Sequence, residues 1–300
     1  MTKLSNLTKS SVFFIFFIML TIGCSNISTE ENIVEQEEKK PLPTEIIANG
    51  NMIYAAQEYA VPADEVAEML KYSYPKNPNK QVFLTFDDGP CKYTKTILGI
   101  LKDKEVHATF FVLGSQLRYE SSKSIIKQTI EEGHSIANHS FSHSYKKLYP
   151  GRRVNVKTFM DEIDTTNKMI KNIVGTTFDT RVLRLPGGYG TRIYFRDVNL
   201  PLLDSALRKE NIVSLDWSAE TKDAVGRRYS TKQLVKNAIS QSEGQNQVIL
   251  LMHDVKERTV LSLPDIIDHY KSNGYEFKVI SNPSLEKNNN KQTKKVVQSQ

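Results

Sequence analysis

The sequence is poor in cysteine and in long apolar runs. It contains two cysteines in 300 residues, so a framework of structural disulfides is not expected in any compartment. Its N-terminal apolar stretch, Val12 to Gly23, covers twelve residues and is too short to span a bilayer as a stable anchor. No internal repeats are found.

Two further absences narrow the class of function. The zinc-protease pattern H-E-x-x-H does not occur, which disfavours a metalloprotease. The formal net charge is +6, and it falls to +4 if residues 1–23, with two lysines and no acid, are removed. Such a mild positive charge favours approach to anionic membranes or wall polymers. It gives no support for nucleic-acid binding, which calls for a clustered basic face.

The N-terminus has the pattern of a secretory signal. Lys3 and Lys9 form a basic start, and the apolar stretch that follows suits the central region of a signal peptide. The run ends Leu-Thr-Ile-Gly before Cys24, which resembles a bacterial lipoprotein signal. We therefore expect cleavage before Cys24, lipidation of that cysteine, and anchoring to the outer face of the bacterial cell membrane. An ordinary signal peptide followed by a chance cysteine is the alternative.

Composition divides the chain into one large domain and its extensions. We expect a signal peptide at 1–23, a polar flexible tether at 24–49, an N-terminal extension at 50–80, a main domain at 81–281 and a disordered basic tail at 282–300. The extension contains a predicted helix from Ala63 to Tyr72. A core of about 200 residues buries roughly 70% of its unfolded surface and needs no disulfides. We expect a monomer.

The most informative segment is Thr85-Phe86-Asp87-Asp88-Gly89-Pro90. An apolar run from Gln81 to Thr85 predicts a buried strand, and two adjacent carboxylates stand at its end. Neighbouring side chains of a strand point to opposite faces, so both acids can serve one site only where that alternation breaks. The Gly-Pro turn that follows can break it. A solvated acidic turn is the alternative.

A histidine pair follows downstream, at His139 and His143. A glycine upstream and intervening serines argue against a helix here, and we predict a short strand from Ser135 to Ser140 that runs into a loop. Two imidazoles and one carboxylate make a three-ligand site for a divalent ion. Such a site leaves open positions for water and substrate, as in catalytic rather than structural sites. Two surface histidines are the alternative.

Three more apolar runs end in polar groups. Arg184 follows the first and precedes two glycines, Asp216 and Trp217 close the second, and His253 closes the third. Alone, these read as a glycine turn and a core histidine. Together, five such runs alternate with predicted helices and predict a parallel α/β barrel with its catalytic residues at one rim. The predicted helices are 95–103, 122–132, 157–172, 231–242 and 261–273, and the last strand is 275–280.

The ordered motifs T-F-D-D-G-P, H-S-x-x-H, R-x-P-G-G, D-W and L-x-H-D resemble the polysaccharide deacetylases of carbohydrate esterase family 4, the NodB-homology domain. The resemblance covers about residues 80–281. It implies a distorted (β/α)7 barrel of the NodB type. It also implies removal of N- or O-acetyl groups from polysaccharides with the help of one divalent metal ion. Zinc is the expected ion, with cobalt, nickel and manganese as alternatives.

The resemblance also implies a role for each motif residue. Asp87 is the expected catalytic base, and Arg184 contacts it. His253 is the expected general acid, tuned by Asp216. The remaining roles are metal ligation by Asp88, His139 and His143, a backbone oxyanion donor at Gly187, and a pocket for the acetyl methyl group lined by Trp217 and Leu251.

Two positions stand out against the family pattern. Many members carry tyrosine or another bulky residue where this chain has Gly187, so a side-chain wall of the substrate groove is missing at this position. Cys91 directly follows the first motif. It is expected to be a small buried residue, with an extra metal ligand or a redox-sensitive thiol as alternatives.

The sequence therefore predicts a membrane-tethered, metal-dependent N-deacetylase. N-acetylglucosamine in the glycan strands of peptidoglycan is the expected substrate, because a lipoprotein on the outer face of a Gram-positive cell membrane meets this polymer first. A β-1,6-linked surface polymer or chitin-like oligomers are alternative substrates, and an O-acetyl group on xylan is a weaker one. A non-catalytic wall-binding protein on the same fold is the alternative from another class.

Overall fold

The computed structural model describes residues 40–71, 78–225 and 229–284. The fold below is that of the unit from Pro41 onward. The predicted signal peptide, Cys24 and most of the tether lie outside the described residues, as do residues 285–300 of the predicted tail. Within the described segments, no helix combines the length and apolar character needed to cross a bilayer.

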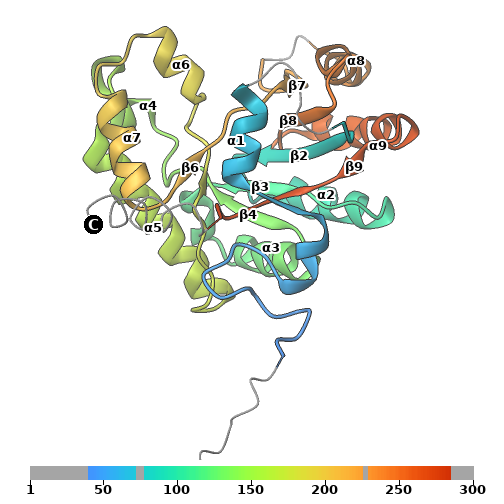
Figure 1. The fold of residues 1–300 in the computed structure, drawn as a ribbon, viewed down its shortest axis with the longest axis horizontal. Coiled ribbons are helices and arrows are strands. Elements are labelled where there is room, and N and C mark those ends of the chain that lie inside the picture. The colour runs from blue at the N-terminus through green and yellow to red at the C-terminus, as the bar shows by residue number, and fades with distance from the viewer. Residues whose placement is uncertain (1–39, 72–77, 226–228, 285–300) are drawn as a thin grey trace, which may run out of the picture. The chain divides into compact units, whose positions relative to one another are not determined.

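The centre of the fold is a curled sheet in which every pairing is parallel. Its strand order is β6-β5-β4-β3-β2-β8-β7, and β9 pairs with the start of β2. The outermost strands of this path, β6 and β7, do not pair, so the sheet forms an open half-barrel (Figure 1). The predicted α/β class and distorted barrel are confirmed. The strands are β2 (Gln81–Asp87), β3 (Thr109–Val112), β4 (Ser135–Asn138), β5 (Val182–Leu183), β6 (Val213–Ser214), β7 (Ala219–Glu220), β8 (Gln247–His253) and β9 (Glu276–Phe277).

Amphipathic helices cover the outside of this sheet (Figure 1). The five predicted helices are confirmed as α2, α3, α5, α8 and α9, with ends that shift by a few residues. Helix α7, the short helices and strands β1 (Ala60–Pro62), β3 and β7 had no predicted counterpart. The helices are α1 (Ala63–Lys71), α2 (Lys92–Asp103), α3 (Glu120–Glu131), α4 (Tyr145–Leu148), α5 (Val156–Val174), α6 (Tyr189–Tyr194), α7 (Leu200–Lys209), α8 (Thr231–Ser242) and α9 (Glu257–Ser272). Three 3-10 turns, η1 (Tyr54–Tyr59), η2 (Gly114–Arg118) and η3 (Pro150–Arg152), complete the chain.

Strand alternation decides which side chains face the inside of the half-barrel. On β2, Leu84 and Phe86 pack into the large core beneath the helices, whereas Phe83 belongs to the smaller interior cluster. Because side chains alternate, Asp87 shares the inner face with Phe83. On β8, Ile249 is in the same interior cluster, so His253 also lies on the inner face. The sheet thus directs one acid and one histidine toward a common site.

Both ends of the folded unit extend beyond the predicted domain boundaries. The predicted tether reaches residue 49, but the fold already begins at Pro41, because Ile46 and Ile47 pack against the core and the Asn49 N–H donates to Thr177 O. Helix α1 is confirmed and buries Val66 in the interior cluster. Strands β1 (Ala60–Pro62) and β10 (Val279–Ser281) pair beside it. Residues 282–284 also belong to the fold, since the Ser284 N–H donates to Asp64.

Candidate active site

The end of β2 brings two adjacent carboxylates to one site. Asp87 points to the inner face, and the backbone at Asp88 is left-handed, with φ of 80°. The alternation of the strand therefore breaks at Asp88 itself, one residue before the expected Gly-Pro turn. Gly89 is needed next, because a Cβ there would lie 2.0 Å from Asp254 Oδ2. This turn explains how neighbours in sequence can serve the same site.

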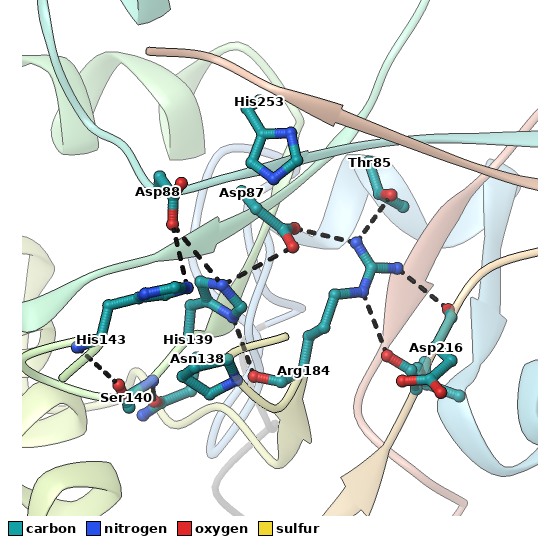
Figure 2. Close-up of polar contacts among 12 residues, drawn as sticks. Thr85, Asp87, Asp88, Asn138, His139, Ser140, His143, Arg184, Asp216 and His253 are labelled. Carbon is teal, nitrogen blue, oxygen red and sulfur yellow. Dashed lines mark hydrogen bonds and ion pairs between the residues drawn. The ribbon is translucent and has the colours of Figure 1, made fainter. Parts of the chain in front are cut away.

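Arg184 contacts Asp87, the neighbour that the family resemblance assigned to it. Its Nη1 donates to Asp87 Oδ1 at 2.8 Å and to Thr85 Oγ1 at 2.9 Å, and its side chain is fully buried (Figure 2). The remaining guanidinium N–H groups donate to the carbonyl oxygens of Leu215 and Asp216. Burial raises the pKa of Asp87 above its ordinary value, while the adjacent Arg184 acts to lower it. The arginine fixes the position of the carboxylate and compensates its charge.

Asp88, His139 and His143 form a cluster with the character of a metal site. Asp88 Oδ1 lies 3.6 Å from the Nε2 atom of each histidine, and the ligand atoms of all three residues fall within 4.8 Å of one another (Figure 2). Asp88 Oδ1 is buried and has no hydrogen-bond partner among the described residues. An orphaned carboxylate oxygen facing two imidazole nitrogens fits a divalent cation.

The protonation of His139 also suits metal ligation. Its Nδ1 lies 2.8 Å from Arg184 O, so the ring donates its Nδ1–H to this carbonyl and turns the Nε2 lone pair toward Asp88. Burial lowers the pKa of His139 to about 3, which keeps the imidazole neutral. In metal sites, a ligating histidine usually donates its other ring N–H to a neighbouring group, which fixes the orientation of the ring.

Glu162 of α5 shapes the loop that carries both histidines, and no pattern in the sequence pointed to this role. Its Oε2 accepts the backbone N–H groups of Phe141 and Ser142, and its Oε1 accepts the Ser142 hydroxyl. The loop has left-handed backbone at Ser140 and at His143. Such backbone costs free energy and persists where surrounding contacts impose it. Glu162 supplies those contacts from the adjoining helix.

His253 lies beside Asp87 in the register of β2 and β8, and its carboxylate partner is not the one that the sequence predicted. Asp223 Oδ1 lies 2.8 Å from the ring Nδ1 of His253. Asp223 Oδ2 accepts hydrogen bonds from the backbone N–H of His253 and from the Thr259 hydroxyl. Burial lowers the pKa of His253, but Asp223, together with Asp87 and Asp88, outweighs it and raises the value to about 9. The partner is Asp223, where Asp216 was expected.

Strand order explains this correction. Asp223 follows β7, which pairs with β8, whereas Asp216 follows β6 at the far end of the sheet. Asp216 instead accepts the backbone N–H groups of Tyr189 and Gly190, at 2.7 and 2.8 Å, and so fixes the loop of the third motif. Strand β7 has only two residues, too few to give a periodic signal in the sequence.

The remaining predicted residues lie around the same rim. Leu251 precedes His253 by two positions on β8 and shares its face. Trp217 packs against Gly188, where a Cβ would lie 2.9 Å from the indole, and its ring lies 5.7 Å from the Arg184 guanidinium. Gly187 has φ of 78°, and its N–H donates to no other described residue. That N–H is free to serve as an oxyanion donor.

Cys91 is only partly buried and caps helix α2. Its sulfur accepts the Tyr93 N–H at 3.4 Å and lies 3.3 Å from Asp254 O. The metal cluster of the described residues does not include it. Cys91 is therefore a helix cap rather than the small buried residue that we expected.

The fold and site together define a class, the α/β half-barrel proteins with a two-histidine, one-aspartate cluster at the strand ends that could hold a cation. Within it, the polysaccharide deacetylase profile matches residues 74–199. A solved CE4 esterase of Streptococcus mutans is 34% identical, with a TM-score of 0.72 over 80% of this chain and all of that one. The chain belongs to the polysaccharide deacetylase family, whose members are hydrolases that act on polysaccharides.

Two further similar proteins carry a more specific name. The catalytic domain of a peptidoglycan N-acetylglucosamine deacetylase from Eubacterium rectale is 31% identical, with a TM-score of 0.60 over 70% of this chain and 93% of that one. A peptidoglycan-N-acetylglucosamine deacetylase of Bacillus cereus is 29% identical over 238 residues, which are 76% of this chain and 78% of that protein.

Proposed function

We propose that this protein hydrolyses the N-acetyl groups of N-acetylglucosamine residues in peptidoglycan. The observation that carries the proposal is the placement of Asp87 and His253 on adjacent strands, next to the Asp88–His139–His143 cluster (Figure 2). The arrangement offers a base and an acid to one bound amide. The two peptidoglycan deacetylases to which the chain is similar support this choice of substrate.

Asp87 is the proposed general base. Its Oδ2 lies 3.7 Å from His139 Nε2, so its carboxylate borders the cation site and can accept a proton from the attacking water. Arg184 keeps this carboxylate oriented and compensated during the transfer. A divalent cation held by Asp88, His139 and His143 supplies Lewis acidity, which polarises the amide carbonyl and lowers the pKa of water.

His253 is the proposed general acid. An amine leaves poorly unless it is protonated, so a proton donor is needed on the leaving-group side. With its pKa raised to about 9, His253 carries that proton at neutral pH. Asp223 accepts from Nδ1–H and leaves Nε2–H to face the site. The free Gly187 N–H is the proposed donor to the oxyanion.

The proposed ion is zinc, because two imidazoles and one carboxylate are its usual catalytic ligands. The proposed location is the outer face of the cell membrane, through a lipid on Cys24. This placement rests on the signal pattern of the sequence and brings the site to the wall polymer. Mass spectrometry of the mature N-terminus tests it: an unmodified N-terminus that does not begin at Cys24 would disprove the anchor.

Acetate release tests the reaction. Residues 25–300, loaded with zinc or cobalt, are incubated with N-acetylglucosamine oligomers and with purified peptidoglycan, beside Asp87→Asn. Release by the parent and not by the variant, with peptidoglycan preferred, is expected. Preference for the oligomers favours a chitin-like substrate. Release from neither, with one metal per chain, rejects this substrate in favour of a differently linked or O-acetylated polymer. Release from neither without bound metal favours a wall-binding protein.

A further inference from the structure

Tyr145 occupies the space that a side chain at position 187 would need. A Cβ built on Gly187 would lie 2.2 Å from Tyr145 Oη and 3.1 Å from Tyr145 Cζ. Real Cβ atoms do not approach other atoms so closely, so a larger residue at 187 and Tyr145 in this position exclude each other. Gly187 also has left-handed backbone, which L-residues rarely adopt. The glycine of the third motif and the tyrosine of α4 therefore form a matched pair.

The ring of Tyr145 is held at the edge of the cation site. It meets His143 edge-on at 5.6 Å between ring centroids, and Tyr149 at 5.7 Å. Tyr149 is buried, and its hydroxyl donates to Pro186 O at 3.1 Å, which ties this pair of rings to the third motif. Contacts on two sides thus fix Tyr145 between the histidine loop and Gly187.

Tyr145 remains accessible to a ligand despite these contacts. The residue is 48% exposed, and its hydroxyl makes no hydrogen bond to another described residue. A phenol ring offers an apolar face for the C–H groups of a sugar and a hydroxyl that can donate or accept. The free Gly187 N–H lies immediately beside it. The two unengaged groups present a recognition surface next to the cation cluster.

We propose that Tyr145 is a substrate-positioning residue that supplies the groove wall missing at Gly187. It packs on the sugar ring that carries the reacting acetyl group and donates its hydroxyl to that sugar. The inference rests on the proposed function. It assigns Tyr145 to binding of the glycan in the ground state, and it leaves proton transfer with Asp87 and His253.

Steady-state kinetics of the zinc-loaded protein test this role on N-acetylglucosamine oligomers. Tyr145→Ala is expected to raise KM about tenfold, the size expected for a lost hydrogen bond and ring contact, while kcat changes by about twofold at most. Tyr145→Phe keeps the ring and is expected to raise KM about threefold. Tyr119→Ala, at a tyrosine 62% exposed ahead of α3, is the matched control and is expected to change neither constant. An unchanged KM in Tyr145→Ala overturns the proposal, as does a loss confined to kcat.

A double-mutant cycle tests the pairing with Gly187. Gly187→Ala introduces a Cβ that displaces Tyr145 and is expected to lower kcat/KM. In the Tyr145→Ala background the same change is expected to cost about fivefold less, because no ring remains to displace. Equal costs in both backgrounds would show that the two positions act independently and would overturn the pairing.

Binding separates failure of this inference from failure of the proposed reaction. Calorimetric titration of N-acetylglucosamine oligomers into zinc-loaded Asp87→Asn needs no turnover. Adding Tyr145→Ala to that variant is expected to raise the dissociation constant about tenfold, because binding becomes weaker. If the parent releases no acetate but this difference appears, the reaction is wrong and the positioning role stands. If the oligomers bind equally with and without Tyr145, or do not bind at all, the positioning role is wrong.

Discussion

Asp87 and His253 occupy the last paired position of strands β2 and β8, so they emerge side by side from a parallel pair of strands. Each has its own buried partner, Arg184 for the acid and Asp223 for the histidine. The two partners carry opposite charges, and they favour an ionised carboxylate on one strand and a protonated imidazole on the next. One strand register thereby places the proposed base and the proposed acid at the same rim.

Replacing Asp223 should move the basic limb of the pH–rate profile. The raised pKa of His253 keeps its acid form present up to about pH 9, and activity is expected to fall as pH rises through that value. Asp223, Asp87 and Asp88 are the acids that raise this pKa. Asp223→Asn removes the largest of these effects, so the limb should move to lower pH, and kcat/KM at pH 8 should fall about tenfold or more.

Asp216→Asn is the matched control, because it changes the carboxylate that the sequence had assigned to His253. Asp216 contacts the N–H groups of Tyr189 and Gly190 and not the histidine. Its variant should keep the basic limb near pH 9. Histidine NMR titration of both variants gives a second readout. A limb that moves in Asp216→Asn and stays in Asp223→Asn would contradict the assignment.

Gly89→Ala should destabilise the fold. The new Cβ would lie 2.0 Å from Asp254 Oδ2 and 2.6 Å from Cγ, and Asp254 is buried, with Oδ2 accepting the Thr94 hydroxyl at 2.6 Å. Overpacking of this kind costs about 2 kcal/mol of unfolding free energy. Gly99→Ala is the control, because a Cβ within α2 at that position meets nothing within 4 Å. It should stabilise the helix by up to about 1 kcal/mol. Urea denaturation of both variants measures the difference, and equal stabilities would refute the clash.

Arg184→Ala should be among the most destabilising single changes at the site. It removes the cation that compensates the buried Asp87 carboxylate and leaves that charge without its partner. Breaking a buried pair from one side costs about 3–5 kcal/mol. Arg181→Ala, three residues earlier, breaks a partly exposed pair with Asp179 and should cost about 1 kcal/mol or less. Unfolding midpoints that are lowered equally by both would disprove a special role for Arg184.

The elements that the sequence predicted best are long enough to show a clear pattern of apolar residues. Strands β2 and β8 each have seven residues, and helices α5 and α9 are long enough to show a helical period. Because both strands end in reactive groups, Asp87 and His253 could be placed at one rim before the structure was known.

The parts that were missed depend on short elements and on strand order. Asp223 follows a two-residue strand, and Tyr145 starts a helix of four residues, so neither lies in a segment with a recognisable period. Pairing His253 with Asp216 failed because Asp216 follows β6, which does not pair with β8, whereas Asp223 follows β7, the neighbour of β8 in the sheet. A residue that directly follows the strand paired with β8 is therefore a better candidate partner for His253 than one that follows a strand elsewhere in the sheet.

Glu162→Ala should weaken metal binding without removing a ligand. Glu162 accepts three hydrogen bonds from the loop between His139 and His143, and these hold a loop with left-handed backbone at Ser140 and His143. Loss of such supporting contacts reduces metal affinity about 10–100-fold. Competition with a zinc chelator measures this directly. Asp161→Ala, on the solvent side of the same helix and with a side chain that pairs with Lys157, should leave the affinity unchanged. An affinity equal to the parent in both variants would mean that the ligand loop keeps its shape without Glu162, and its strained backbone would then need another source of support.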